Sequence, residues 1–372
     1  MRVALVGLGF GEEFVPIYLH HPGVDELVIC DTDPAVLDAV SRRYHVTQRT
    51  TDFEEVLRSR DVDAVHLVTP IPLHAGQALA VLDAGKHCAC TVPMATRLED
   101  LEAILRAQRS SRKVYMVMET AVYTREFLMV QDMVNRGELG RIQFLRGAHY
   151  QDMENWPSYW RGLPPMHYAT HAIAPLRLLA GRRLAEVQCL GSGVMRPELR
   201  QPYGNPFPVE TAILRFHGGE TAAEVTRSLF HTARAYTESF CVYGENATFE
   251  WQQVEEEQPV VFRMEPPRPG RGRPVSVQRV EAPDRPDLLP AEIRRFTRRG
   301  VYDETNPHLS FLQGGGHGGS HPHLVHEFVS AIKEERAPAV DALTAANITA
   351  AGVCAHLSAM EHGARVDIPS FA

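Results

Sequence analysis

The chain lacks the basic excess and the long apolar runs that mark two common classes of protein. Its 38 lysines and arginines are outnumbered by 46 acidic residues, which gives a formal net charge of −8. A nucleic-acid binder needs a basic surface for its phosphate contacts, so no nucleic-acid partner is expected. No apolar run approaches the roughly 20 residues that span a bilayer, so no membrane partner is expected either.

Paired cysteines are also lacking, because the six cysteines are scattered along the chain and form no disulfide framework. Cys88 and Cys90 would lie on one face of a strand, but no second close pair completes a zinc site. The sequence opens with MRVALVGLG, which indicates a first strand without a preceding signal peptide. We therefore expect a reduced, cytoplasmic protein without a bound metal.

The pattern that is present divides the 372 residues into two domains. In residues 1–121 buried strands alternate with helices, which predicts an α/β domain with a doubly wound parallel sheet. The expected strands of this domain lie at 2–6, 26–33, 62–70, 86–94 and about 114–120.

The pattern changes in residues 122–372, where apolar and polar residues alternate in several runs, as they do in antiparallel strands. These runs predict a second α/β domain with a large, mostly antiparallel sheet covered on one face. The alternating runs lie at 141–150, 210–216, 221–230 and 237–243. Residues 265–290 are rich in proline and arginine and predict an extended loop or arm. Helices are expected at 124–137, 321–335 and 342–362.

A glycine pattern directly follows the first strand and opens the first helix. Gly7 allows a tight turn, and Gly9 lets the backbone approach a pyrophosphate. The third glycine of the usual spacing is replaced by Glu12, although Gly11 lies one residue earlier. Together with Phe10 these glycines form the candidate cofactor loop, in the strand–turn–helix context that the motif requires.

Asp31 ends the second expected strand and is the candidate ligand of the adenosine ribose. A carboxylate at this position repels a 2′-phosphate, so NAD is favoured over NADP. The alternative role is local, with Asp31 capping the turn at Thr32–Asp33.

An ordered series of motifs resembles the glucose–fructose oxidoreductase/inositol dehydrogenase (Gfo/Idh/MocA) family. The motifs are TPIPLH at 69–74, AGKH at 84–87 and a strand ending in Val92-Pro93. The resemblance implies an N-terminal Rossmann domain and a C-terminal α/β domain whose open sheet often makes dimers, so a homodimer or homotetramer is expected. It also implies a set of residues that line the cofactor cleft, namely Thr69, Pro70, His74, Val92 and Pro93.

One departure from the family concerns catalysis. Sugar dehydrogenases of the family usually end the fourth strand with Glu-Lys-Pro, whereas this chain has Thr91-Val92-Pro93 and lacks the lysine. The family also carries an Asp and a His four residues apart on a helix. His167 and His171 have that spacing, which predicts that they stack on one helical face. Zinc binding would need further ligands that the sequence does not specify, and an ordinary core or surface histidine is the other alternative.

Three local motifs resemble family-109 glycoside hydrolases, which also lack the lysine. They are METAVY at 118–123, YATH at 168–171 and GHGG at 316–319. Those enzymes, like the related NAD-dependent sulfoquinovosidases, keep NAD bound and hydrolyse glycosides through a transient ketone. The resemblance implies that Tyr168 and His171 are acid/base residues and that His317 binds substrate. This chain differs from those enzymes at His167 and at 320–323, so the resemblance does not identify its substrate.

The remaining candidate residues concern the substrate. Aromatic side chains before the catalytic helix could pack on a sugar ring, and Arg161 could hold an anionic substituent; the alternative for Trp156 and Trp160 is an interdomain core. The predicted substrate-binding residues are Glu119, Tyr123, Tyr159, Trp160, Arg161 and His317.

A second histidine cluster follows the glycines at 314–316, 318 and 319, which could let the backbone wrap around a ligand. Ser320 could cap the helix that begins near His321. For His321, His323 and His326 a functional role and a solvated helix start are equally open.

These observations predict an NAD-dependent, carbohydrate-active enzyme with Tyr168, His171 and His167 as catalytic residues. Hydride would leave a sugar hydroxyl, expected at C3. Glycoside hydrolysis by oxidation, elimination, water addition and reduction is the favoured reaction, because no pair of catalytic carboxylates is identified. The alternatives are a plain NAD-dependent sugar or cyclitol dehydrogenase and a sensor without turnover.

Overall fold

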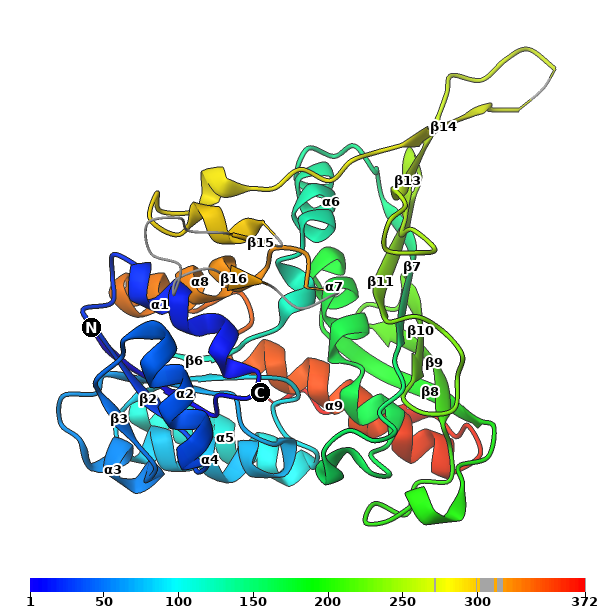
Figure 1. Cartoon of the computed structure of the whole chain (residues 1–372). Helices are drawn as coiled ribbons and strands as arrows, with labels where there is room; N and C mark the ends of the chain where they lie inside the picture. The colour runs from blue at the N-terminus through cyan, green and yellow to red at the C-terminus, as the bar shows by residue number, and fades with distance from the viewer. Residues whose placement is uncertain (271, 299, 302–310, 313–316, 372) are drawn as a thin grey trace. The chain divides into compact units, whose positions relative to one another are not determined.

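Two compact units make up the computed structural model of the chain, which is drawn in Figure 1. The described residues are 1–270, 272–298, 300–301, 311–312 and 317–371. Unit 1 comprises residues 1–123, 284–346 and 371, and unit 2 comprises 124–283 and 347–370. The glycines at 314–316, expected to wrap around a ligand, lie outside the described residues.

Unit 1 contains a six-stranded sheet in which all neighbouring strands run parallel. The strand order β3-β2-β1-β4-β5-β6 is that of a Rossmann sheet. The strands are β1 (Arg2–Val6), β2 (Glu26–Cys30), β3 (Arg49–Thr50), β4 (Ala64–Leu67), β5 (His87–Cys90) and β6 (Tyr115–Val117). β4 is buried along its whole length, as a strand covered on both faces should be. The predicted parallel sheet is confirmed.

Helices connect these strands, and their ends follow from local sequence. Asp33 accepts a hydrogen bond from the Ala35 amide at 2.8 Å and so caps α2, whose first residue is Pro34. A 3-10 turn precedes the first α-helix of the unit. The helical elements are η1 (Gly11–Phe14), α1 (Val15–His20), α2 (Pro34–Tyr44), α3 (Phe53–Arg58), η2 (Ile71–Leu73), α4 (His74–Asp83), α5 (Leu98–Ser111) and η3 (Thr120–Val122).

A segment far along the chain, residues 284–346, also belongs to unit 1. Leu324 and Phe328 of α8 (His321–Lys333) lie in the same apolar core as Val15 and Tyr18 of α1. Burial of this shared apolar surface draws the segment into unit 1. Unit 1 is therefore discontinuous in sequence, which differs from the predicted single boundary at 121/122. The elements of the segment are η7 (Pro286–Leu288), η8 (Arg294–Thr297), β15 (Gly300–Val301), β16 (Phe311–Leu312) and α8 (His321–Lys333).

Unit 2 contains a nine-stranded sheet of order β14-β13-β12-β11-β7-β10-β9-β8-β17. Only the β7–β10 pair among these described strands is parallel, so the predicted mostly antiparallel sheet is confirmed. The strands are β7 (Ile142–Tyr150), β8 (Leu184–Ser192), β9 (Val209–Phe216), β10 (Ala222–Ser228), β11 (Thr237–Gly244), β12 (Ala247–Glu250), β13 (Val260–Met264), β14 (Val275–Arg279) and β17 (Val366–Asp367).

One helix of unit 2 lies directly on this sheet. A Cβ at Gly147 of β7 would lie 2.3 Å from the carbonyl oxygen of Ala172 in α7 (Thr170–Ala180), so only glycine allows this approach. As a result the start of α7 and the turn before it lie over β7, β10 and β11. The helical elements of the unit are α6 (Arg125–Asn135), η4 (Ser158–Trp160), η5 (Pro165–Tyr168), α7 (Thr170–Ala180) and η6 (Pro197–Leu199).

Two segments differ from expectation. The predicted arm at 265–290 contains β14, which pairs antiparallel with β13; its flanking prolines and arginines hide the alternation of Val275 and Val277. Helix α9 (Ala342–Met360) confirms the helix expected at 342–362, but it has the length and composition of a membrane span, whereas no such run was expected. However, 78% of its apolar stretch is buried inside the protein, as in a core helix.

Candidate active site

The predicted cofactor loop connects β1 to η1 at the carboxyl end of the parallel sheet. Gly7 has a φ of +89°, and a Cβ there would lie 2.4 Å from the carbonyl oxygen of Val68. Gly9 is exposed, and a Cβ there would meet no atom within 4 Å. The turn therefore requires Gly7, whereas the backbone at Gly9 is open to a ligand. Such an open backbone after the first strand fits the pyrophosphate of a dinucleotide.

Asp31 lies at the end of β2 and is bound to this loop. Its Oδ2 accepts a hydrogen bond from the Leu8 amide at 2.7 Å, and its Oδ1 accepts one from the Asp33 amide at 2.8 Å. The local capping role therefore exists, and it fixes the carboxylate beside the loop. Each carboxylate oxygen has a second lone pair, so the same group fits two ribose hydroxyls.

The other predicted cofactor residues follow β4 and β5. His74 is buried, and its ring nitrogens lie 2.8 Å from the carbonyl oxygens of Thr69 and of Pro93. Burial lowers the pKa of His74, and the two carbonyl contacts oppose that shift. His74 thus ties the two loops together. Pro70 is exposed, and the buried Val92 precedes Pro93 through a cis peptide bond.

His317 and Phe10, predicted on separate grounds, lie together in unit 1. Their ring centroids are 5.4 Å apart, and the ring centroid of His321 lies 5.6 Å from that of Phe10. His321 and His323 are buried, so the alternative of a solvated helix start is wrong for both. Ser320 occupies the N-cap position of α8, but its side chain makes no capping hydrogen bond, contrary to expectation.

Glu119 and Tyr123 also belong to unit 1. The buried Glu119 carboxylate accepts a hydrogen bond from the Ala121 amide at 3.1 Å and caps η3. The Tyr123 ring is parallel to that of His323, with centroids 6.4 Å apart. Burial raises the pKa of Tyr123 well above its usual value, so its hydroxyl stays protonated.

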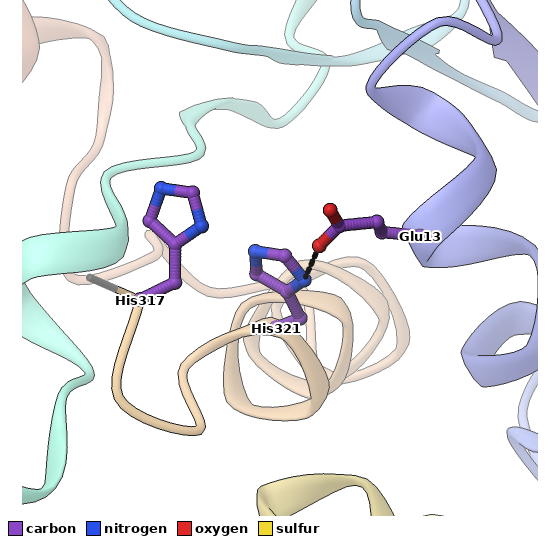
Figure 2. Close-up of side chains that lie close together, drawn as sticks. All are labelled: Glu13, His317 and His321. Carbon is purple, nitrogen blue, oxygen red and sulfur yellow. Dashed lines mark ion pairs between the residues drawn. The ribbon is translucent and has the colours of Figure 1, made fainter. Parts of the chain in front are cut away.

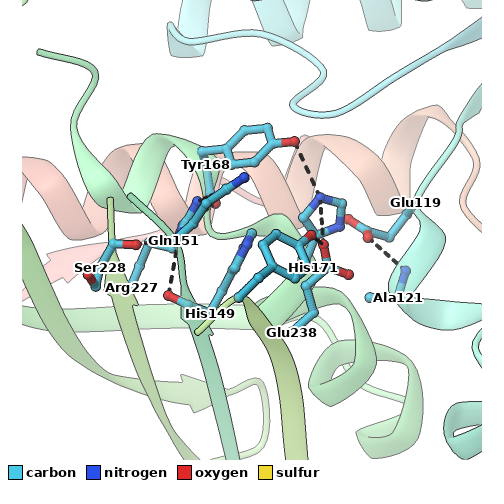
Figure 3. Close-up of polar contacts among 10 residues, drawn as sticks. Glu119, Ala121, His149, Gln151, Tyr168, His171, Arg227, Ser228 and Glu238 are labelled. Atoms are coloured by element: carbon cyan, nitrogen blue, oxygen red, sulfur yellow. Dashed lines mark hydrogen bonds and ion pairs between the residues drawn. The ribbon is translucent and has the colours of Figure 1, made fainter. Parts of the chain in front are cut away.

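A buried polar cluster forms over the sheet of unit 2, as Figure 3 shows. His171 Nε2 lies 3.4 Å from the Tyr168 hydroxyl and 3.5 Å from Oε1 of Glu238. The side chains of His171 and Glu238 are only 3% and 1% exposed. Tyr236 donates a hydrogen bond to the same carboxylate oxygen. His171 therefore lies between a phenol and a carboxylate, an arrangement suited to acid–base chemistry, in which contacts are often long before a ligand binds.

Arg227 of β10 supplies a positive charge beside Tyr168. Its guanidinium is fully buried and donates hydrogen bonds to the carbonyl oxygens of Tyr168 at 2.9 Å and His149 at 3.2 Å. Its Cζ lies 5.5 Å from the centroid of the Tyr168 ring. Burial lowers the pKa of Arg227 to about 10, so it remains charged at neutral pH.

His167 differs from expectation. The prediction that it shares a helical face with His171 is wrong, because His167 belongs to η5 and α7 begins at Thr170. Its ring centroid lies 5.2 Å from that of His356, which in turn contacts Glu210 at 2.7 Å. Burial, and then the neighbouring His356, lower the pKa of His167 to about 3. It is therefore neutral at neutral pH.

The aromatic residues before α7 have distinct environments within unit 2. Trp160 is buried and packs edge-on against Tyr168, with ring centroids 4.7 Å apart. Tyr159 is half-buried beside Trp160, and Arg161 is exposed. Trp156 is 55% exposed.

Among the cluster residues that were not predicted from sequence, three lie on strands of the sheet, namely His149 of β7, Arg227 of β10 and Glu238 of β11. Each occupies a buried position of an alternating strand, in phase with apolar neighbours. A polar residue at an inward-facing position is unusual, and this is the signal that could have found them.

Two family models match almost the whole chain. Residues 1–119 match the NAD-binding Rossmann fold of the Gfo/Idh/MocA oxidoreductase family, and residues 131–368 match its C-terminal alpha/beta domain. The chain belongs to this family. It is therefore an NAD-dependent oxidoreductase-fold enzyme, and residues 1–119 of unit 1 form its NAD-binding domain.

Curated relatives and solved structures are consistent with this membership. A glycosyl hydrolase family 109 protein of a Shewanella species is 26% identical over 285 residues, which cover 67% of this chain and 62% of the relative. An alpha-N-acetylgalactosaminidase of Shewanella oneidensis is 25% identical over 285 residues, with the same coverage of 67% and 62%. The matched part of the chain thus spans less than two thirds of these relatives. A levoglucosan dehydrogenase in complex with NADH and levoglucosan has the same fold, with a TM-score of 0.77, 22% identity and 99% coverage of both chains.

Proposed function

We propose that this protein is an NAD-dependent carbohydrate enzyme that hydrolyses a glycoside through transient oxidation of a sugar hydroxyl. The observation that carries the proposal is His171 held between the Tyr168 phenol and the Glu238 carboxylate. The names of the curated relatives, glycosyl hydrolases among them, support the substrate class.

The cofactor side of the proposal depends on the geometry of unit 1. The open backbone at Gly9 would hold the pyrophosphate, and Asp31 would bind the adenosine ribose, which favours NAD over NADP. When bound, NAD supplies an acceptor that takes a hydride from a sugar carbon and later returns it.

His171 is the proposed base for the hydroxyl group that is oxidised. Loss of hydride from a carbinol carbon also requires loss of the hydroxyl proton, and His171 Nε2 accepts it. The resulting imidazolium lies 3.5 Å from the Glu238 carboxylate, whose negative charge stabilises it in a buried setting. Glu238 thus acts through His171 as a positioning residue.

Tyr168 is the proposed second acid/base group. The positively charged guanidinium of Arg227, whose Cζ lies 5.5 Å from the ring centroid, attracts negative charge that develops on the phenol oxygen during proton transfer. A ketone at C3 acidifies the proton on C2, so a base of modest strength can remove it and expel the aglycone. Water then adds at C1, and a proton returns to C2.

The carboxylate groups of unit 2 around His171 favour the elimination route over direct hydrolysis. Direct cleavage usually takes two carboxylates about the glycosidic oxygen. In unit 2, Glu238 is the carboxylate that contacts His171. The elimination route needs no carboxylate pair.

The test is incubation of the enzyme with neutral, N-acetylated and anionic aryl glycosides in deuterated water without added NAD. The expected result is release of the aryl alcohol with deuterium at C2 of the sugar and no net NADH. Stoichiometric NADH with an intact, oxidised glycoside would instead establish the plain dehydrogenase. Hydrolysis without deuterium at C2 would contradict the elimination route.

A further inference from the structure

Three side chains from separate places in unit 1 bring their polar atoms together beside the cofactor loop. Glu13 belongs to η1, His317 lies in the loop before α8, and His321 is the first residue of α8. One nitrogen or oxygen of each side chain lies within 4.8 Å of those of the other two (Figure 2). His321 Nδ1 and Glu13 Oε2 are 3.3 Å apart.

Packing fixes the two imidazole rings of this group. His321 is fully buried, and its ring centroid lies 4.5 Å from that of Phe14. The Ser320 amide donates a hydrogen bond to the His317 carbonyl oxygen at 2.9 Å, which closes a turn between the two histidines. Gly319 permits that turn, because its φ is +80° and a Cβ there would lie 2.5 Å from the Thr297 carbonyl oxygen. The two rings are thereby held 5.2 Å apart.

The donor atoms and their spacing suit a transition metal ion. Imidazole nitrogen and carboxylate oxygen bind zinc at roughly 2.0–2.2 Å in tetrahedral geometry, so neighbouring ligand atoms lie about 3.3 Å apart. The His321–Glu13 distance of 3.3 Å already has this value. The Glu13 side chain is 24% exposed, so it has room to adjust and bring the remaining distances closer. Its negative charge also offsets part of the charge of a divalent cation.

We propose that Glu13, His317 and His321 form a binding site for one divalent transition metal ion, with Zn²⁺ as the first candidate. Three protein ligands leave a fourth position for water. The ion would connect the loop that carries His317 to the helical turn that follows the cofactor loop. No step of the proposed function uses a metal, and a bound metal was not expected from the sequence.

The test is zinc titration of metal-stripped protein by calorimetry, with Co²⁺ absorption spectroscopy as a report of coordination. We expect saturation at about one equivalent and visible Co²⁺ bands typical of four-coordinate geometry. Glu13→Gln and His317→Asn should each weaken zinc affinity by about tenfold or more, since loss of even an outer-shell partner costs 10–100-fold. His317 is only half-buried, so His317→Asn keeps the test valid if another variant fails to fold.

Two matched variants serve as controls. Glu12→Gln alters the neighbouring carboxylate, which pairs with Arg43, and His326→Gln alters a second histidine pair, in which His21 Nε2 lies 3.1 Å from His326 Nδ1. Both variants should bind zinc like the wild type. The proposal is overturned if wild type shows no saturable binding, or if Glu13→Gln and His317→Asn bind as tightly as wild type. Because no sugar is present, this result is independent of the proposed function.

Discussion

The two units place their chemistry in different parts of the chain. In unit 1 the cofactor region is made mainly of backbone, at the open Gly9 and the tight turn at Gly7. In unit 2 the proposed proton-handling cluster is made of buried side chains from three strands and helix α7, such as Arg227, Glu238 and His171. The difference teaches that cofactor binding and turnover should be separable by substitution.

The largest effect is expected for His171→Ala, which removes the proposed base. Turnover should fall by a factor on the order of 100 or more, while NAD affinity stays unchanged because unit 1 is unaltered. Steady-state kinetics and an NAD titration measure the two quantities. Near-normal turnover would refute the role of His171. Loss of NAD binding would refute the claim that cofactor binding and turnover are separable by substitution.

Tyr168→Phe sharpens the comparison within unit 2. Turnover should fall on the order of 10- to 100-fold with little change in KM, because the phenol takes part in proton transfer. Arg227→Lys keeps the charge but loses the planar fork of hydrogen bonds, so its loss in turnover should be smaller. A Tyr168→Phe variant that loses affinity yet keeps its kcat would mean that Tyr168 only holds the sugar.

Asp31→Ala tests the other half of the comparison, which is cofactor binding by unit 1. NAD affinity should weaken by about tenfold and the discrimination against NADP should relax, because the ribose ligand and its charge are lost. At saturating NAD, kcat should be nearly unchanged. Asp31→Asn is the matched control, since it keeps an acceptor for the Leu8 amide, which now binds Oδ2 at 2.7 Å. Unchanged NAD affinity in both variants would remove Asp31 from the site.

The smallest effect is expected for His167→Gln, because His167 contacts His356 and is already neutral. Turnover should change by less than about threefold. The folded-state pKa of about 3 lies below the unfolded value of roughly 6.5. Below that value the unfolded chain binds a proton that the folded chain does not, so stability falls as the pH falls from 6.5 towards 3. His167→Gln should therefore show a shallower loss of melting temperature in acid; an equally steep loss would contradict the assignment.

Much of the fold could be predicted from the sequence, because periodicity and turn residues are local. The buried strands around Gly7 and Asp31 predicted the parallel sheet, and alternation predicted the antiparallel one. The discontinuity of unit 1 could not be predicted in this way, since the burial of Phe328 against α1 joins residues about 300 positions apart.

The candidate site shows the same limit. The Tyr168–His171 pair lies within one short motif and was predicted by resemblance. Arg227 and Glu238 join the cluster only through the register of β10 and β11 against β7, which no local pattern specifies. The prediction that His167 shares a helical face with His171 is wrong, because the 3-10 turn η5 that contains His167 ends before α7 begins.

The central claim is that NAD oxidises the sugar hydroxyl whose proton the proposed base His171 accepts. Rapid mixing of NAD-loaded protein with sugar, followed by the absorbance of reduced nicotinamide, tests it most directly. Wild type should form reduced cofactor, and His171→Ala should form it on the order of 100-fold more slowly at equal NAD occupancy. Reduction at the same rate in both proteins, or turnover of the sugar without any reduction, would contradict the account.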